Sequence, residues 1–195
     1  MAVGVLAVQG AAREHLEMLC RLGAEARPVR TPTEIAASEA LILPGGESTT
    51  IGKLMARYGL LEPVRQLAAA GKPLLGTCAG MILMAKHIHA AAKDQPSLSV
   101  MDIAVQRNAF GRQIASFEAD LEIEGLDGGP LRAVFIRAPV ISSVAPEVTV
   151  LASHEGRIVA ARQANMLALA FHPELTDDPR LHQYFLDMRC RGTPC

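Results

Sequence analysis

Short apolar runs alternate with segments of helical period through the first half of the chain, and this alternation limits the fold more than any other feature. It predicts strands at Val3–Val8, Ala24–Arg30, Ala40–Leu43 and Leu74–Gly76. The segments between them predict helices at Glu14–Leu22, Ser48–Tyr58, Leu60–Ala70 and Ala79–Ala91. Strands that are apolar throughout are typical of a parallel sheet with helices on both faces. The first half therefore predicts an α/β arrangement.

The second half changes character and predicts mostly short strands separated by turns. These strands are expected at Leu98–Gln106, Ser116–Ile123, Ala133–Ile136, Val148–Ser153, Arg157–Ala161 and Met166–Phe171, followed by a closing helix at Pro179–Cys190. The Gly-rich stretch at 125–130 is interpreted as a loop and not as a linker between domains, because no disordered sequence surrounds it. We expect one domain over residues 1–195, with an α/β fold of three layers: an open mixed sheet flanked by helices.

Composition excludes several classes of function. The 195 residues include 19 basic and 20 acidic side chains, so a formal charge of −1 gives no field for binding nucleic acid or an anionic membrane. No run of about 18 apolar residues is present, and the first residues lack the features of a signal peptide. The four cysteines have no CxxC spacing. We expect a cytoplasmic protein with reduced thiols.

Chemically useful residues follow the strongest predicted strands. They are Gln9-Gly10, Pro44-Gly45-Gly46-Glu47-Ser48, Thr77-Cys78-Ala79-Gly80 and His172-Pro173-Glu174. Open α/β sheets bind ligands beyond the carboxyl ends of their strands. The sequence therefore predicts that a thiol, a glycine-rich turn, a histidine and a carboxylate meet at one edge of the sheet.

The string Gly76-Thr77-Cys78-Ala79-Gly80 has the form of a sharp strand-to-helix turn that exposes a nucleophile. At the start of a helix, the positive end of the helix dipole favours the thiolate. The amide of Ala79 would then face the oxyanion formed by attack. A cysteine by itself is more often a buried structural residue. The flanking glycines and the strand–helix context favour the nucleophile here.

His172 and Glu174 are predicted to act as an acid–base pair. Positions i and i+2 of an extended segment project to the same side, so the carboxylate can reach the imidazole. His172 would take the proton of Cys78 and return it to a leaving nitrogen. A surface histidine with a chance acidic neighbour is the alternative interpretation, and the elbow cysteine weighs against it.

The Gly45-Gly46 turn can supply the amide of Gly46 as a second oxyanion donor. An ordinary turn or a phosphate-binding nest remains an alternative. Neither a Walker A loop nor a GxGxxG fingerprint is present, so no nucleotide cofactor is expected.

No metal site is expected either. His87 and His89 are two residues apart on a predicted helix, where their side chains would diverge. Asp177-Asp178 is interpreted as a helix start. Cys20 is expected to pack within the first helix, and Cys190 and Cys195 to be incidental.

Taken together, these motifs resemble the class I, or triad, glutamine amidotransferases, whose fold is flavodoxin-like. Finer strings resemble one branch, the glutaminase subunits of pyridoxal 5′-phosphate synthase (the PdxT family). The strings are Val8-Gln9-Gly10, Arg13-Glu14-His15, Leu43–Thr50, Gly76–Gly80, Arg107–Gln113, Ser116–Ala119, Phe135–Pro139 and Phe171–Thr176. They cover nearly the whole chain. Ala109, where a serine is common, is a mild departure.

The resemblance implies a role for each matching residue. Cys78 would be the nucleophile, with His172 and Glu174 completing the triad. The glutamine pocket would be lined by Gly46, Glu47, Ser48, Arg107, Ile136 and Arg137. A zwitterionic substrate needs a cation for its carboxylate, which agrees with the arginines.

The implied reaction is hydrolysis of the side-chain amide of L-glutamine, without a metal or organic cofactor. The ammonia would pass to a synthase subunit, in a large hetero-oligomer, for condensation with ribose 5-phosphate and glyceraldehyde 3-phosphate. Family members are poor glutaminases until docked, so docking is expected to order the turn at Gly45-Gly46.

Three alternatives remain open at this point. The chain could be the glutaminase subunit of another pathway, such as that of imidazole glycerol phosphate synthase. It could be a non-catalytic binding module on the same fold. A cysteine peptidase is disfavoured, because no extended peptide groove is evident from the sequence.

Overall fold

A parallel sheet forms the centre of the molecule. The computed structural model describes residues 2–89, 95–107, 109 and 116–188. Strands β1 (Ala2–Leu6), β3 (Ala40–Leu43), β4 (Leu74–Thr77) and β12 (Met166–Leu169) lie side by side in this order and run parallel, with β2 (Glu25–Val29) beside β1. Almost all of their side chains except those of β2 are buried. The predicted strands of the first half are confirmed.

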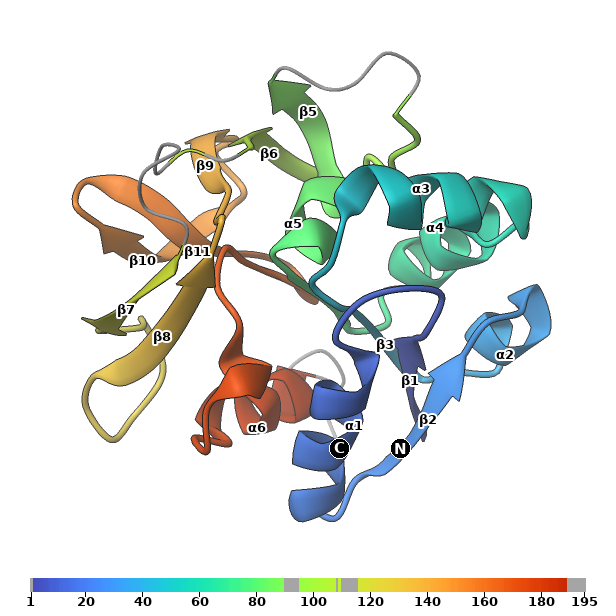
Figure 1. Ribbon diagram of the computed structural model, residues 1–195, viewed down its shortest axis with the longest axis horizontal. Helices are drawn as coiled ribbons and strands as arrows, with labels where there is room; N and C mark the ends of the chain where they lie inside the picture. Colours follow the sequence, from blue (N-terminus) through green and yellow to red (C-terminus); the bar gives the residue numbers. More distant parts are fainter. Residues whose placement is uncertain (1, 90–94, 108, 110–115, 189–195) are drawn as a thin grey trace.

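Helices cover both faces of this sheet, as the sequence predicted (Figure 1). On one face lie α1 (Ala12–Arg21) and α6 (Arg180–Asp187). On the other lie α3 (Ser48–Arg57) and α4 (Leu61–Ala69), with α2 (Pro32–Ala36) packed against α4. The three-layer interpretation is therefore confirmed.

The second half extends the sheet in a mainly antiparallel manner. The added strands are β6 (Met101–Gln106), β9 (Val140–Val144), β10 (Thr149–His154) and β11 (Arg157–Gln163), with β5 (Ala85–His89) parallel to β6 at the edge. Within the described ranges, the path through the sheet is β2-β1-β3-β4-β12-β11-β9-β6-β5, and β10 pairs with β11.

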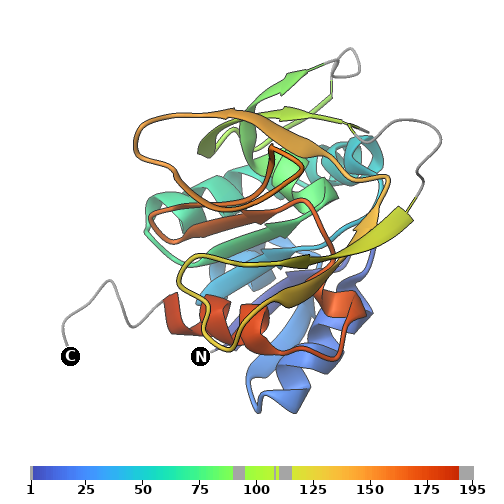
Figure 2. The same ribbon diagram turned by 90° about the vertical axis from the view of Figure 1, so that its left-hand side faces the viewer.

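A separate hairpin is formed by β7 (Ser116–Leu121) and β8 (Leu131–Ile136). Figure 2 shows it, in yellow, between the β10–β11 pair and α6. Phe135 of β8 contacts the rings of Phe117 and Phe171. This aromatic cluster joins the hairpin to the segment that follows β12, so one hydrophobic core runs through both halves of the chain.

Three parts of the predicted secondary structure were wrong or missing. The helix expected at Ala79–Ala91 ends early, as α5 (Ala79–Met84), and the chain continues as β5 because the next residues pair with β6. Pairing with a neighbouring strand overrides local helix propensity here. The short elements α2 and β9 were not predicted. The end of the last predicted helix, at Cys190, lies outside the described residues.

None of the helices within the described ranges is both long and apolar enough to cross a membrane.

Candidate active site

Cys78 lies at a strained turn between β4 and α5. Its backbone has φ +48° and ψ −99°, a conformation that residues with a Cβ rarely adopt. A Cβ on Gly80 would overlap the carbonyl oxygen of Leu43, and one on Gly76 would crowd Met84. Only glycine fits at these two positions. The strand-to-helix turn predicted from the sequence is therefore present. Backbone strain of this kind in a residue other than glycine is typical of functional sites.

His172 and Glu174 lie just beyond the end of β12. The Nδ1 atom of His172 is 2.7 Å from Oε1 of Glu174, and the Glu174 side chain is fully buried. The carboxylate reaches the ring through a 3₁₀ turn, η1 (Pro173–Leu175), and not through the extended segment that we expected. The backbone N–H of His172 donates to the carbonyl of Val134 on β8. One hydrogen bond thus holds the backbone of His172 and another holds its ring.

The register between β4 and β12 brings the thiol and the imidazole together. Thr77 pairs with Leu169, and the N–H of Cys78 donates to the Leu169 carbonyl at 2.8 Å. Burial by itself lowers the pKa of His172, but hydrogen bonds with Cys78 and Glu174, and their negative charges, raise it to about 10. At neutral pH His172 is therefore an imidazolium held between the sulfur and the carboxylate.

The glycine-rich turn after β3 lies directly against this pair. A Cβ on Gly45 would overlap the ring of His172. The carbonyl of Gly45 accepts from the N–H of Ala11 at 3.0 Å, and the N–H of Glu47 donates to the side-chain oxygen of Gln9 at 3.0 Å. The segments after β1, β3, β4 and β12 therefore meet at one edge of the sheet, as predicted.

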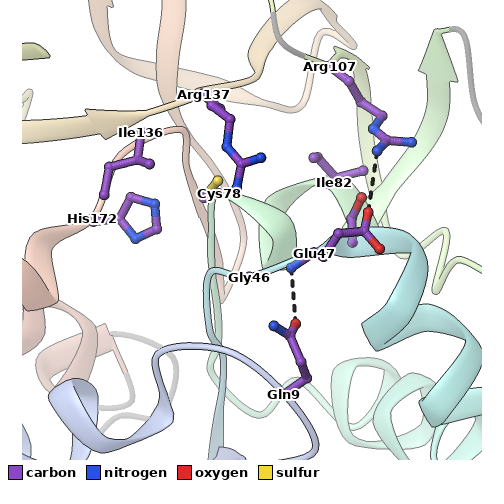
Figure 3. A pocket seen from close by; sticks show the side chains of 10 residues that line it. Gln9, Gly46, Glu47, Cys78, Ile82, Arg107, Ile136, Arg137 and His172 are labelled. Atoms are coloured by element: carbon purple, nitrogen blue, oxygen red, sulfur yellow. Dashed lines mark hydrogen bonds and ion pairs between the residues drawn. The ribbon is translucent and has the colours of Figure 1, made fainter. Parts of the chain in front are cut away.

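A cavity of about 300 Å³ opens at this edge (Figure 3). It is lined by Gln9, Gly46, Glu47, Ser48, Cys78, Ile82, Arg107, Ile136, Arg137 and His172. All residues that the resemblance assigned to the glutamine pocket are among them. Gln9 and Ile82 were not assigned to it from the sequence. Ile82 lies one helical turn after Cys78, and that spacing could have identified it.

Charged groups in the cavity include Glu47 and Arg107. Glu47 caps α3: its carboxylate accepts from the backbone N–H groups of Thr49 and Thr50. Burial opposes ionisation, but these bonds and the hydroxyl of Thr50 outweigh it and lower the pKa of Glu47. Nη2 of Arg107 lies 3.4 Å from Oε1 of Glu47.

Arg137 brings a second guanidinium to the cavity. Its backbone has φ +45°, and its side chain extends in the direction of Cys78 in Figure 3. Ala79, the other expected oxyanion donor, is the first residue of α5. The N–H groups of a first helical turn lack acceptors within their helix. The cavity therefore combines a thiol, the imidazole that pairs with Glu174 and two guanidinium groups.

The remaining candidates lie away from the cavity. His87 and His89 are exposed on β5 and not on a helix, so our reason for rejecting a metal site there was wrong. Across the ranges that the structure describes, no group of three acidic, histidine or cysteine residues could hold a metal ion. Cys20 is exposed, contrary to our expectation that it packs. Asp178 accepts from the N–H of Arg180, as expected at a helix start.

Asn108 and residues 110–113, which belong to the family-like string Arg107–Gln113, lie outside the described residues, and so do Cys190 and Cys195.

Comparisons with known proteins match nearly the whole chain. The profile of the SNO glutamine amidotransferase family matches residues 5–191. The pyridoxal 5′-phosphate synthase subunit PdxT of Roseiflexus castenholzii is 59% identical over 189 residues, which cover 96% of this chain and 100% of the relative. PdxT of Carboxydothermus hydrogenoformans is 55% identical over 192 residues, with 98% and 100% covered.

Solved structures show the same fold. A crystal structure described as glutamine amidotransferase has a TM-score of 0.90 and 53% identity, covering 95% of this chain and 97% of its own. PurLQS from Thermotoga maritima, at 17% identity, has a TM-score of 0.67 and shares the fold alone; it covers 95% of this chain and 97% of its own.

Proposed function

Because the chain belongs to the SNO glutamine amidotransferase family, we propose that it hydrolyses L-glutamine to L-glutamate and ammonia. We further propose that it supplies this ammonia to a pyridoxal 5′-phosphate synthase subunit, as the name of its relatives indicates. The observation that carries the proposal is the cavity in which Cys78, on a strained elbow, faces His172 paired with Glu174.

The reaction follows from these positions. The sulfur of Cys78 attacks the side-chain carbonyl carbon of glutamine, and the amides of Gly46 and Ala79 stabilise the oxyanion. His172 gives its proton to the departing nitrogen, which leaves as ammonia. Water, activated by the now neutral His172, then cleaves the glutamyl thioester and releases glutamate. Glu174 holds the imidazole in one tautomer and stabilises its charged form throughout.

The rest of the cavity recognises the amino-acid end of the substrate. Arg107 and Arg137 provide cations for the α-carboxylate. Glu47 provides a carboxylate for the α-ammonium group, since its hydrogen bonds to α3 keep it ionised. Ile136 and Ser48 complete the walls.

The proposal has consequences for the wider context of the chain. The reaction requires no cofactor, and the pyridoxal product belongs to the partner's site. We propose that residues 1–195 act as a single domain, supported by the hydrophobic core that spans both halves. A cytoplasmic site of action is proposed because the chemistry needs a reduced thiol, and Cys78 and Cys20 are both free.

The test is glutamate release from glutamine by the purified chain, with and without a synthase subunit from the same source. We expect activity that rises when the synthase is added and disappears in Cys78→Ala. Cys20→Ala is the matched control, because it removes an exposed thiol on α1 outside the cavity.

Other outcomes would change the assignment. Full activity that the synthase does not alter would keep the triad chemistry but place the chain in another pathway. No glutamate release under either condition would favour a binding module.

A further inference from the structure

A buried polar cluster lies behind the triad, on the side away from the cavity. It consists of His15 on α1, Thr77 on β4 and His182 on α6, and all three side chains are fully buried. Nδ1 of His15 is 2.9 Å from Nε2 of His182, and Nε2 of His15 is 3.3 Å from the hydroxyl of Thr77. Burying two imidazoles is costly unless their hydrogen bonds are made.

The cluster reaches the oxygen of Glu174 that His172 leaves free. Oε1 of Glu174 is bound to His172, whereas Oε2 is buried and has no hydrogen-bond partner among the described residues. The Nε2 atom of His15 lies 3.4 Å from this oxygen. Hydrogen bonds at catalytic groups are often long before substrate binds and tighten in the working complex.

Only one choice of tautomers for His15 and His182 satisfies the hydrogen bonds of the cluster. If His15 donated through Nδ1 to His182, its Nε2 would carry a lone pair facing a carboxylate oxygen, and Oε2 of Glu174 would have no donor. If His182 donates through Nε2 to His15, then Nε2 of His15 carries a hydrogen that can be shared between the hydroxyl of Thr77, at 3.3 Å, and Oε2 of Glu174, at 3.4 Å. This second arrangement leaves only the lone pair of His182 Nδ1 unpaired, and that atom is the other buried polar atom without a partner.

Both histidines are neutral in this arrangement. Burial is the main cause that lowers the pKa of His15, and the charge of His172 lowers it further, against the carboxylates of Glu174 and Glu14. Burial and the neighbouring His15 lower the pKa of His182 to about 3. Each ring therefore has a single N–H, as the choice of tautomers requires.

We propose that His15 is a positioning residue that donates from Nε2 to the second oxygen of Glu174, in a tautomer set by His182. The inference rests on the proposed function, since it assigns His15 a role in the triad. With both oxygens held, the carboxylate cannot rotate away from His172 while the imidazole alternates between charged and neutral forms. Thr77, directly before the nucleophile, lies within reach of the same N–H and ties the cluster to the elbow.

The first test uses the unaltered protein. Long-range proton–nitrogen correlation spectra of the ¹⁵N-labelled chain distinguish which ring nitrogen of His15 carries the hydrogen. We expect hydrogen on Nε2 and a bare Nδ1. A ring protonated at Nδ1 alone would overturn the proposal without any variant being made.

The second test compares His15→Leu with His15→Gln, in complex with the synthase subunit. Glutamine can place an amide N–H near the position of Nε2, whereas leucine fills the space without a donor. We expect kcat of His15→Leu to fall about tenfold with KM unchanged. This loss is smaller than the full rate contribution of a positioned acid–base group, because His172 itself is still present. We also expect the pKa of its His172, followed by NMR titration, to fall by about one unit as the carboxylate turns away.

His15→Gln should retain most of both properties. Leu19→Ala is the matched control, because it removes buried packing from the same helix without removing a donor. It should lower stability and leave kcat and the titration of His172 unchanged. A purely structural role for His15 predicts instead that His15→Leu and Leu19→Ala behave alike, which would overturn the proposal.

The two proposals can fail separately. If the unaltered complex releases no glutamate, the proposed function is wrong. If it is active and His15→Leu matches it in kcat and in the titration of His172, only the positioning role is wrong.

Discussion

Single residues matter most in this site where a side chain would not fit. Gly45 is such a position, because an added Cβ would overlap the ring of His172. We expect Gly45→Ala to lower kcat about 100-fold, since a displacement of the catalytic ring by about 1 Å has an effect of that size. Glutamate release at saturating glutamine measures it.

Gly59→Ala is the control for this substitution. Gly59 has a positive φ, of +67°, and nothing lies within 4 Å of an added Cβ. Its cost is about 1 kcal/mol of backbone strain, with kcat unchanged. Equal kcat in both variants would show that Gly45 does not maintain the position of His172.

Buried His182 makes the protein sensitive to acid. Its pKa is about 3 in the folded chain against 6.5 for the ordinary group, because burial and His15 oppose the charge. The unfolded chain therefore binds a proton that the folded chain does not. This contribution to stability is fully present above about pH 6.5 and is lost as the pH falls toward 3, by about 1.4 kcal/mol per unit.

His182→Gln removes this titration. Urea unfolding at several values between about pH 6.5 and 4 should show a shallower loss of stability in the variant than in the unaltered chain. Parallel curves for the two proteins would contradict the assignment of a neutral His182.

At the scale of elements, α3 combines structural and substrate-binding roles at its first turn. Glu47 caps this helix and lines the cavity, so Glu47→Ala should cost about 1 kcal/mol of stability and also raise KM for glutamine. The measurements are chemical denaturation and steady-state kinetics.

Thr31→Ala is the matched comparison. Thr31 caps α2 in a reciprocal arrangement with Glu34, away from the cavity. The Thr31→Ala variant should lose about as much stability as Glu47→Ala, and its KM for glutamine should be unchanged. A KM effect of equal size in both variants would show that the cap of α3 has no separate role in binding.

Local signals in the sequence were enough to predict most elements, whereas an element that depends on long-range pairing could not be predicted. β3 was predicted with its observed ends, because Pro44-Gly45-Gly46 stops it. α2 was missed, although Thr31, Pro32 and Glu34 form a recognisable capping pattern. β5 could not be separated from α5, because only its pairing with β6 makes it a strand.

The whole molecule connects the hairpin β7–β8 to the catalytic histidine. Phe135 is fully buried against Phe117 and Phe171, and His172 directly follows Phe171. Phe135→Ala should cost about 3–5 kcal/mol. It should also lower kcat about tenfold, because the cavity it leaves lets His172 shift. Denaturation and glutamate release test the two effects.

Ile35→Ala is the control at this scale. Ile35 is equally buried, but on α2 and outside the cavity. It should lose about 2–5 kcal/mol without a change in kcat at a temperature where the variant is folded. An unchanged kcat in Phe135→Ala as well would show that the hairpin supports only stability.

The overall fold also determines which residues of the site could be predicted from the sequence. Cys78, His172, Glu174 and Gly46 could be brought together from the sequence, since parallel strands end at one edge. Arg107, Ile136 and Arg137 were expected only through the resemblance, because they lie at and beyond the ends of β6 and β8, outside the parallel part of the sheet. The contact of His15 with His182 joins α1 to α6, and no local pattern encodes such a long-range contact.

The position of β12 has a consequence for how the chain is synthesised. Among the strands of the described residues it is made last, yet it lies in the middle of the sheet between β4 and β11. A nascent chain carries the cysteine elbow long before the strand that delivers His172 and Glu174 has been made. A chain that stops before residue 172 therefore carries the thiol without the acid–base pair, and we expect it to release no ammonia from glutamine.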